Sequence, residues 1–220
     1  MGTQYASALS KNANCQALVS LTLAQGEVPV PIALRLFLPE AWTKDPERMR
    51  RAGVPDAFHS ERSKPEIALV ELKRALEAGV RFRAVVADAG YGISAAFRQA
   101  LSALGLLWAV GIPRIQKVYP VDVQLVPAPP TRGRPRQTLI PDREAVAAEK
   151  MVAAWPWRWI TWRQGTKGPL RAQFAAIRVR VADGPEVRLQ GRTGQHLPGA
   201  RYRRMLLTVG VRRQRLELVG

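Results

Sequence analysis

Asp88 occupies a position in the sequence where a carboxylate can do chemistry. It follows residues 84–87, a run of β-forming side chains, and precedes Gly90, Gly92 and a segment with helical spacing. This pattern places an acid at the carboxyl end of a strand, where open α/β sheets bind substrates and metals. The turn glycines let a substrate approach the backbone closely. The same pattern also suits a turn residue or a helix N-cap, and spacing alone leaves both interpretations open.

A second group of residues suits phosphate binding. Arg163 and Lys167 flank the turn at residues 165–166, whose backbone N–H groups can join them around one anion. An ordinary hairpin with solvated charges explains the pattern equally well. The candidate phosphate-binding residues, including those of the Pro-rich basic stretch, are Arg132, Arg134, Arg136, Arg163, Lys167 and Arg171.

Four tryptophans, Trp155, Trp157, Trp159 and Trp162, lie close together in the same part of the chain. Indoles of this kind either fill a core or stack on nucleic-acid bases, and we expect packing here. Cys15 is the one cysteine, which excludes an internal disulfide and suits a reducing compartment.

Composition favours a polyanionic partner. The chain holds 34 Lys and Arg against 17 Asp and Glu, a formal net charge of +17. Such a protein attracts nucleic acids or acidic membranes by screened attraction and counterion release. Because no apolar run reaches the ~20 residues that span a bilayer, a membrane anchor is not expected and we predict a cytoplasmic protein.

The elements that would position Asp88 can be read from the apolar pattern. We predict a hairpin of strands at residues 16–23 and 30–38, then a helix that begins at Pro65 and ends at Gly79. A strand at 82–87, a helix at 94–104 capped by Ser94, and a strand at 107–112 follow. This order predicts an α/β fold, with the four strands in one sheet and Asp88 exposed at its carboxyl edge.

Several motifs in the same order resemble insertion-sequence transposases of the DDE superfamily, most closely the seven-oh-one group. They are NCQALVSLTLAQGEVPVPIALRLFLPEAW, DPERMRRAGVP, KPEIAL, ADAGYG with the following FRQAL and WAVGIP, and WRQGTKGPLRAQFAAIRVRVADG. Together they lie between residues 4 and 198. The resemblance implies an RNase H-like (retroviral integrase-like) mixed sheet with helices, present as a partial core with a β-rich insertion subdomain.

The resemblance also implies a domain organisation. Residues 1–113 correspond to the partial catalytic core, 114–150 to a basic Pro-rich linker with a short helix at 143–153, and 151–200 to the insertion subdomain, with a strand at 172–181. Residues 201–220 depart from the family as a basic tail, for which disorder is one expectation. DNA, as insertion-sequence ends and target, is then the expected partner, in the nucleoid, and the full-length protein is expected to form a homodimer.

The chemistry implied by the resemblance is metal-dependent DNA strand cleavage and transfer. Two divalent ions, Mg²⁺ or Mn²⁺, are held by three carboxylates, of which Asp88 matches the second. The first is expected before Met1 and the third beyond the insertion, so we expect a chain truncated at both ends. Asp183, Glu186 and Glu217 lie in a turn and in the tail and are not expected to replace them.

A fragment with one of three carboxylates is expected to be inactive and to hold metal weakly. The alternative function is a non-catalytic basic DNA-binding or regulatory module, which would need the charge but not Asp88. An unrelated metal-dependent hydrolase is disfavoured, because the strands lack the further acids that independent chemistry would need.

Overall fold

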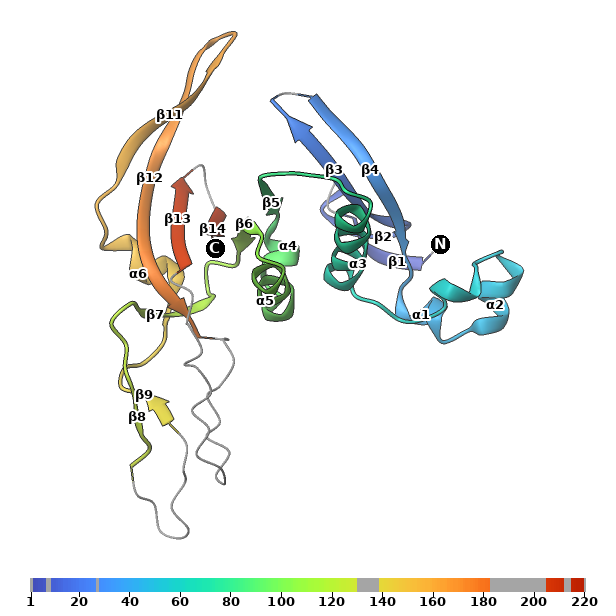
Figure 1. Ribbon diagram of the computed structural model, residues 1–220, viewed down its shortest axis with the longest axis horizontal. Helices are drawn as coiled ribbons and strands as arrows, with labels where there is room; N and C mark the ends of the chain where they lie inside the picture. The colour runs from blue at the N-terminus through green and yellow to red at the C-terminus, as the bar shows by residue number, and fades with distance from the viewer. Residues whose placement is uncertain are drawn as a thin grey trace. The chain divides into compact units, whose positions relative to one another are not determined.

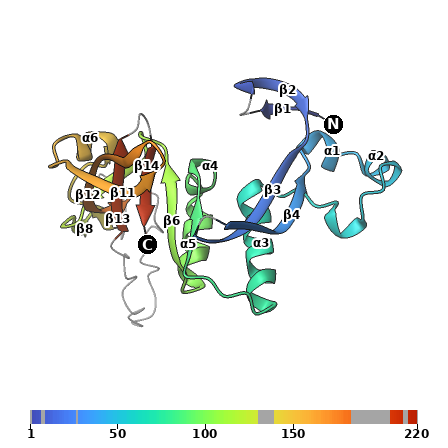
Figure 2. The ribbon, with the colours of Figure 1, turned by 90° about the horizontal axis from the view of Figure 1, so that it is seen from above.

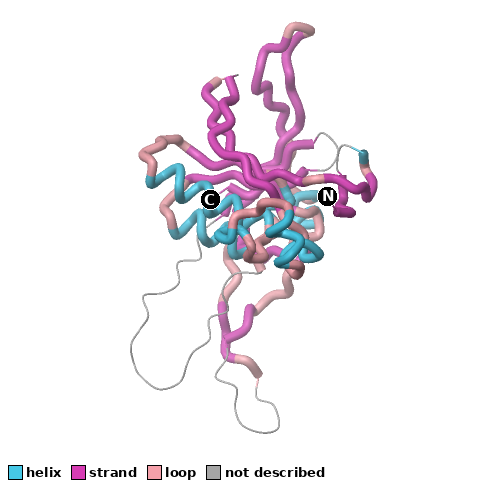
Figure 3. The backbone as a smooth tube through the Cα atoms, turned by 90° about the vertical axis from the view of Figure 1, so that its right-hand side faces the viewer, coloured by secondary structure: helices cyan, strands magenta, loops and turns pink. Residues whose placement is uncertain are grey.

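The computed structural model describes residues 2–6, 9–26, 28–129, 139–182, 205–211 and 215–219. The chain forms two compact units, Met1–Arg83 and Ala84–Gly220, and each is described by itself. Strands contribute more of the described chain than helices do (Figure 3). No helix in the described ranges is long and apolar enough to cross a membrane.

The first unit is built from two antiparallel hairpins and three helices. Strands β1 (Gly2–Ala6) and β2 (Lys11–Cys15) form one hairpin, and β3 (Ala17–Gln25) and β4 (Val28–Phe37) form the other. Helices α1 (Glu40–Thr43) and α2 (Pro46–Arg51), a 3₁₀ turn (Asp56–Phe58) and α3 (Lys64–Glu77) follow. Helix α3 lies against the β3–β4 hairpin (Figure 2).

Helix α3 begins where the sequence predicts. The Ser63 hydroxyl accepts a hydrogen bond from the Glu66 N–H and the Glu66 carboxylate accepts one from the Ser63 N–H, which makes a capping box. The helix buries Ile67 and Leu72, and it also buries Glu71. That carboxylate is neutralised by Arg35 of β4 at 2.8 Å and by Arg74 at 3.0 Å.

The second unit is organised around an eight-stranded sheet. The elements that lie next to Asp88 are β5 (Ala84–Ala87), α4 (Ala89–Gly92), α5 (Ala95–Ala103) and β6 (Leu107–Ile112). The rest are β7 (Lys117–Pro120), β8 (Leu125–Pro127), β9 (Leu139–Pro141), β10 (Val146–Ala147), α6 (Ala148–Ala153), β11 (Arg158–Gly165), β12 (Gly168–Val181), β13 (Met205–Val211) and β14 (Arg215–Val219).

The strand order is β10-β7-β12-β13-β14-β6-β5, with β11 paired to β12. Strands β5 and β6 are parallel and α5 lies between them in sequence, whereas the other pairs in this sheet are antiparallel. Strands β11 and β12 extend beyond the sheet as a long hairpin, drawn in orange in Figure 1. The core includes Trp108, Val110, Val118 and Val179, all at most 1% exposed.

The prediction that four strands form one sheet is wrong. Strands β3 and β4 pair only with each other among the described residues, while β5 and β6 belong to the larger sheet of the second unit. Apolar alternation identifies a strand and the face that it buries, but it does not encode which strand edges pair. The bounds of the predicted strands and helices agree with β3, β4, α3, β5, α5 and β6 to within a few residues.

The second half of the chain forms more regular structure than its composition indicates. The tail at 201–220 contains β13 and β14, which lie between β12 and β6 in the sheet. Of the short helix expected at 143–153, only residues 148–153 are helical, as α6, because residues 146–147 pair with β7 as β10. The Pro-rich stretch contains the small β8–β9 pair. Mixed α/β structure is therefore observed in the second unit, in agreement with the predicted fold class.

Candidate functional site

Asp88 lies directly after β5, at the carboxyl end of a parallel strand. It is the N-cap of α4, and its Oδ1 accepts a hydrogen bond of 2.9 Å from the Gly90 N–H. The N-cap interpretation is therefore confirmed. The side chain nevertheless remains exposed, so the cap does not remove the carboxylate from solvent.

Two glycines fix the turn that carries Asp88. A Cβ on Gly92 would lie 1.8 Å from the Gly111 carbonyl oxygen, and a Cβ on Gly111 would lie 2.7 Å from the Ala89 nitrogen. Both distances are too short for any real contact, so α4 packs on β6 backbone to backbone. This close contact sets the position of Asp88 relative to the sheet.

Side chains of the following segment hold the turn from its other end. The Arg98 guanidinium, which is 2% exposed, donates a hydrogen bond to the Gly92 carbonyl at the end of α4. Ser94 caps α5 by accepting from the Phe97 N–H at 3.2 Å. Burial, and secondarily the nearby charge of Asp88, raise the pKa of Tyr91 above its ordinary value of 10.0.

The described residues contain no group of three or more His, Cys, Asp or Glu side chains that could hold a metal ion. Among the described residues, Asp88 is therefore the one carboxylate offered as a metal ligand at the end of β5. A single carboxylate does not fit a two-metal centre. The backbone of Glu217, which sequence reasoning set aside as part of the tail, pairs with Gly111 across the β14–β6 ladder.

The structure brings three of the predicted phosphate-binding residues onto one hairpin. Arg163 is on β11, Lys167 is in the turn, and Arg171 is on β12 opposite Thr161. Gly168 closes the turn with a φ of 114°, a conformation that favours glycine. Arg132, Arg134 and Arg136 fall outside the described residues.

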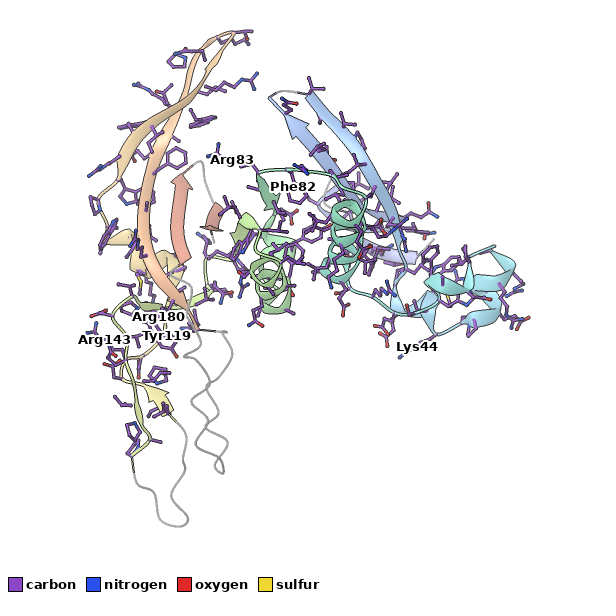
Figure 4. All side chains as sticks on the ribbon, viewed as in Figure 1. Lys44, Phe82, Arg83, Tyr119, Arg143 and Arg180 are labelled. Carbon is purple, nitrogen blue, oxygen red and sulfur yellow. The ribbon has the colours of Figure 1, made fainter. Side chains whose placement is uncertain are left out.

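The base of this hairpin is fixed in the sheet. Arg180 of β12 is opposite Tyr119 of β7, and its Nη1 donates to the Val123 carbonyl at 3.3 Å (Figure 4). Arg143 forms an ion pair of 2.9 Å with Asp122 in the same region. These contacts hold the end of the hairpin near residue 180 in the sheet, and the turn at residues 166–167 lies at the opposite end.

The expectation that the clustered tryptophans are packed is wrong for three of them. Trp155 is 44% exposed, Trp159 is 64% exposed and Trp162 is 53% exposed. For Trp159 and Trp162 the reason is that β11 lies at the margin of the sheet, where it pairs only with β12 among the described strands. Trp155 lies outside that strand, in the connection between α6 and β11. The alternative function of such indoles, stacking on bases, therefore stays open.

A family model described as DDE superfamily endonuclease matches residues 1–169. The match includes all of the first unit and, in the second unit, the elements from β5 to β11, with the Asp88 turn among them. The chain belongs to the DDE superfamily endonucleases. Endonucleases of this superfamily act on DNA with divalent metal ions. No curated protein and no solved structure matches the chain.

Some features of this DDE superfamily endonuclease were beyond sequence reasoning. The roles of Gly111 and Arg98 depend on which segments meet in the folded chain, and no local motif marks them. The exposure of Trp159 had a local signal, because Arg158 precedes it and the polar Thr161 follows two residues later, although Ile160 is apolar.

Proposed function

We propose that this chain belongs to an insertion-sequence transposase of the seven-oh-one group, whose family activity is metal-dependent DNA strand cleavage and transfer. Asp88 is its proposed catalytic and metal-binding carboxylate, and Mg²⁺ or Mn²⁺ is the proposed cofactor. The DNA ends of the element and its target are the proposed partners, met in the nucleoid, and the full-length protein is proposed to act as a homodimer.

One observation supports this assignment above the others. Asp88 is an exposed acid at the carboxyl end of a parallel strand, on a turn that Gly92 and Gly111 hold in a single position. An acid that served only as an N-cap would not need a backbone-to-backbone contact behind it. A metal ligand does need it, because coordination geometry tolerates errors of about half an ångström.

Cleavage directed by Fe²⁺ tests the role of Asp88 without requiring activity. Fe²⁺ takes the oxygen ligands that Mg²⁺ takes, and with ascorbate and peroxide it generates radicals that cut nearby backbone. Because one carboxylate holds a single ion only weakly, we expect weak cuts close to residue 88 in the wild-type chain, suppressed by added Mg²⁺ and lost in Asp88→Ala.

Asp142→Ala is the matched control for this experiment. Asp142 is also exposed in the second unit, and its Oδ1 accepts a backbone N–H at 2.9 Å, from Gln124. Its loss is expected to leave the cuts near residue 88 unchanged. Cuts that persist in Asp88→Ala, or that disappear equally in Asp142→Ala, would contradict a metal role for Asp88.

We further propose that the isolated chain neither nicks nor joins DNA. Two divalent ions carry a charge of about +4, of which one carboxylate offsets too little to fix their geometry. Purified protein is incubated with duplex DNA and Mg²⁺ or Mn²⁺, beside Asp88→Ala. Strand cleavage that is lost only in Asp88→Ala would contradict the proposal and would point to further ligands within this chain or a second copy.

A non-catalytic DNA-binding or regulatory module is the second candidate. It is favoured by the segment at residues 151–182, which holds six Arg and Lys and no Asp or Glu. The two candidates differ in the metal test, because a regulatory module has no use for a metal at Asp88. Both predict that Asp88→Ala leaves DNA affinity in metal-free buffer within about twofold of the wild type, since a single surface charge contributes little.

A further inference from the structure

The tip of the β11–β12 hairpin has two different faces, which follow from its register. Residues directly opposite each other share a face. Thr161 is opposite Arg171 and Trp159 is opposite Gln173, so these side chains form what we call the Trp159 face. Side chains project from both sides of this ribbon (Figure 4).

The other side, which we call the Trp162 face, carries the apolar side chains Ile160, Trp162, Leu170 and Phe174, together with Arg158 and Arg163. Ile160 pairs with Ala172 and Phe174 pairs with Arg158 on this side, and the indole of Trp162 meets Phe174 edge-on at 5.7 Å. Trp162 thus already has an aromatic partner within the hairpin. The Trp162 face is the more apolar of the two.

On the Trp159 face, an exposed indole is combined with a cation. The Trp159 side chain is 64% exposed, and the guanidinium carbon of Arg171 lies 5.2 Å from its ring centroid. This is a cation–π contact that orders both side chains while most of the indole stays accessible. Ordering in advance lowers the entropic cost of binding a ligand on that ring.

The charge of the segment that carries this indole favours an anionic ligand. Arg171 lies on the Trp159 face itself, whereas Arg158 and Arg163 lie on the Trp162 face. Between residues 151 and 182 the cations have no acidic residue among them; they are Arg158, Arg163, Lys167, Arg171, Arg178 and Arg180. Such a segment repels basic and selects anionic partners. Thr161 and Gln173 add hydrogen-bonding groups beside the indole, which suit the polar edge of a base better than an apolar protein surface.

We propose that the Trp159 face binds an unpaired nucleotide of DNA, with the base stacked on Trp159 and the phosphate attracted by Arg171. Bases within a duplex are covered by their neighbours, and only an unpaired base offers its π face to an indole. Strand cleavage and joining produce such nucleotides at ends and gaps. This inference rests on the proposed function only in taking DNA as the partner.

The test compares two labelled DNAs in metal-free buffer: an uninterrupted duplex and the same duplex with a short single-stranded gap. Stacking on an aromatic side chain contributes about 1–3 kcal/mol per base, so Trp159→Ala should weaken binding to gapped DNA roughly tenfold. Binding to the uninterrupted duplex should change less than about twofold, since phosphate contacts remain. Trp159→Phe keeps a π face and should restore most of the loss.

Trp162→Ala is the matched control, because it removes an exposed indole from the same strand on the other face. It should leave the preference for gapped DNA intact. A measurement on the wild-type chain needs no variant: 2-aminopurine placed in the gap should lose fluorescence when protein is added, and 2-aminopurine within the duplex should not.

The outcomes separate this inference from the proposed function. Binding to both DNAs without preference for the gap, no quenching in the gap, or equal losses in Trp159→Ala and Trp162→Ala would overturn the stacking proposal alone. Absence of binding to either DNA would overturn it together with DNA as the partner. A gap preference that only Trp159→Ala removes and Trp159→Phe restores would establish it.

Discussion

The carboxylate of Asp88 caps a helix and stays accessible for the metal role proposed for it. Its Oδ1 accepts the Gly90 N–H and so starts α4, while the side chain stays exposed at the end of β5. Capping and metal binding are compatible, because a carboxylate has about four lone-pair sites and one hydrogen bond occupies one of them. The cap orients the group before any ligand arrives.

Tyr91 reports on the charge of this carboxylate. Burial first, and then the Asp88 charge, raise the pKa of Tyr91 above 10.0. Subtracting the ultraviolet titration of Tyr91→Phe from that of the wild type isolates this residue. In Asp88→Asn we expect the pKa of Tyr91 to fall toward 10.0 without reaching it, because the burial of the ring remains. An unchanged pKa would mean that the carboxylate lies farther from the ring.

The raised pKa of Tyr91 also has a consequence for stability. Its folded-state value exceeds its unfolded value, so the contribution is fully present below pH about 10 and is lost as the pH rises through the folded value. Tyr91→Phe should therefore lose less stability than the wild type as the pH rises above about 10.

The role of a residue can be predicted from the sequence when it depends only on neighbouring positions of the chain. Asp88 and Ser94 follow from strand, glycine and helix patterns within a few positions of the chain. Gly111 and Arg98 act on α4 only after β6 and α5 have packed against it, so no local pattern could reveal them.

At the scale of the element, the contact of α4 with β6 predicts unequal effects for neighbouring glycines. Gly92→Ala places a methyl 1.8 Å from a carbonyl oxygen, whereas Gly90→Ala places one 3.1 Å from the Asp88 side chain, which can rotate. Overpacking of this kind costs about 1–3 kcal/mol or more, and we expect Gly92→Ala at the upper end and Gly90→Ala well below it.

Hydrogen exchange of the β6 amides, followed by mass spectrometry, measures this difference. Local opening of β6 should become markedly faster in Gly92→Ala and change little in Gly90→Ala. Equal protection of β6 in the two variants would show that α4 can move away from β6 without loss of stability. The position of Asp88 would then not be fixed by this contact.

The elements themselves were largely predictable, and their pairing was not. Capping residues and apolar periodicity set the ends of α3 and α5 closely. Strands β13 and β14 were missed because arginines flank the short apolar run of β13 on both sides and precede that of β14, and composition alone indicated a tail. Their place between β12 and β6 depends on tertiary packing, and it separates β6 from β12 by two strands.

At the scale of the whole molecule, we expect charge to dominate binding to DNA. A net charge of +17 predicts duplex binding that tolerates sequence and falls linearly on a plot of log affinity against log salt. Each phosphate neutralised contributes about −0.9 to the slope for B-form DNA. Fluorescence anisotropy at several salt concentrations measures the slope, and Arg163→Ala with Lys167→Ala should reduce its magnitude by about two if both contact phosphates.

A binding curve that does not move with salt would contradict the electrostatic origin of this affinity. Unchanged slopes in the double variant, with the wild-type slope still steep, would assign the phosphate contacts to other cations and leave Arg163 and Lys167 as solvated charges of the hairpin.

The β-bulge at Trp162 has a consequence for how this hairpin can vary in length. The ladder passes from Thr161↔Arg171 to Arg163↔Leu170, so Trp162 is a surplus residue without a partner. Loss of Trp162 would leave every other pair in place, whereas loss of Thr161 would bring Trp162 opposite Arg171. A single codon deleted at this point therefore moves an indole from one side of the hairpin to the other while the ladder stays intact. Relatives that lack one residue here would therefore differ in which side of the hairpin presents aromatic rings. The pairing of residues between the bulge and the turn would be the same in all of them.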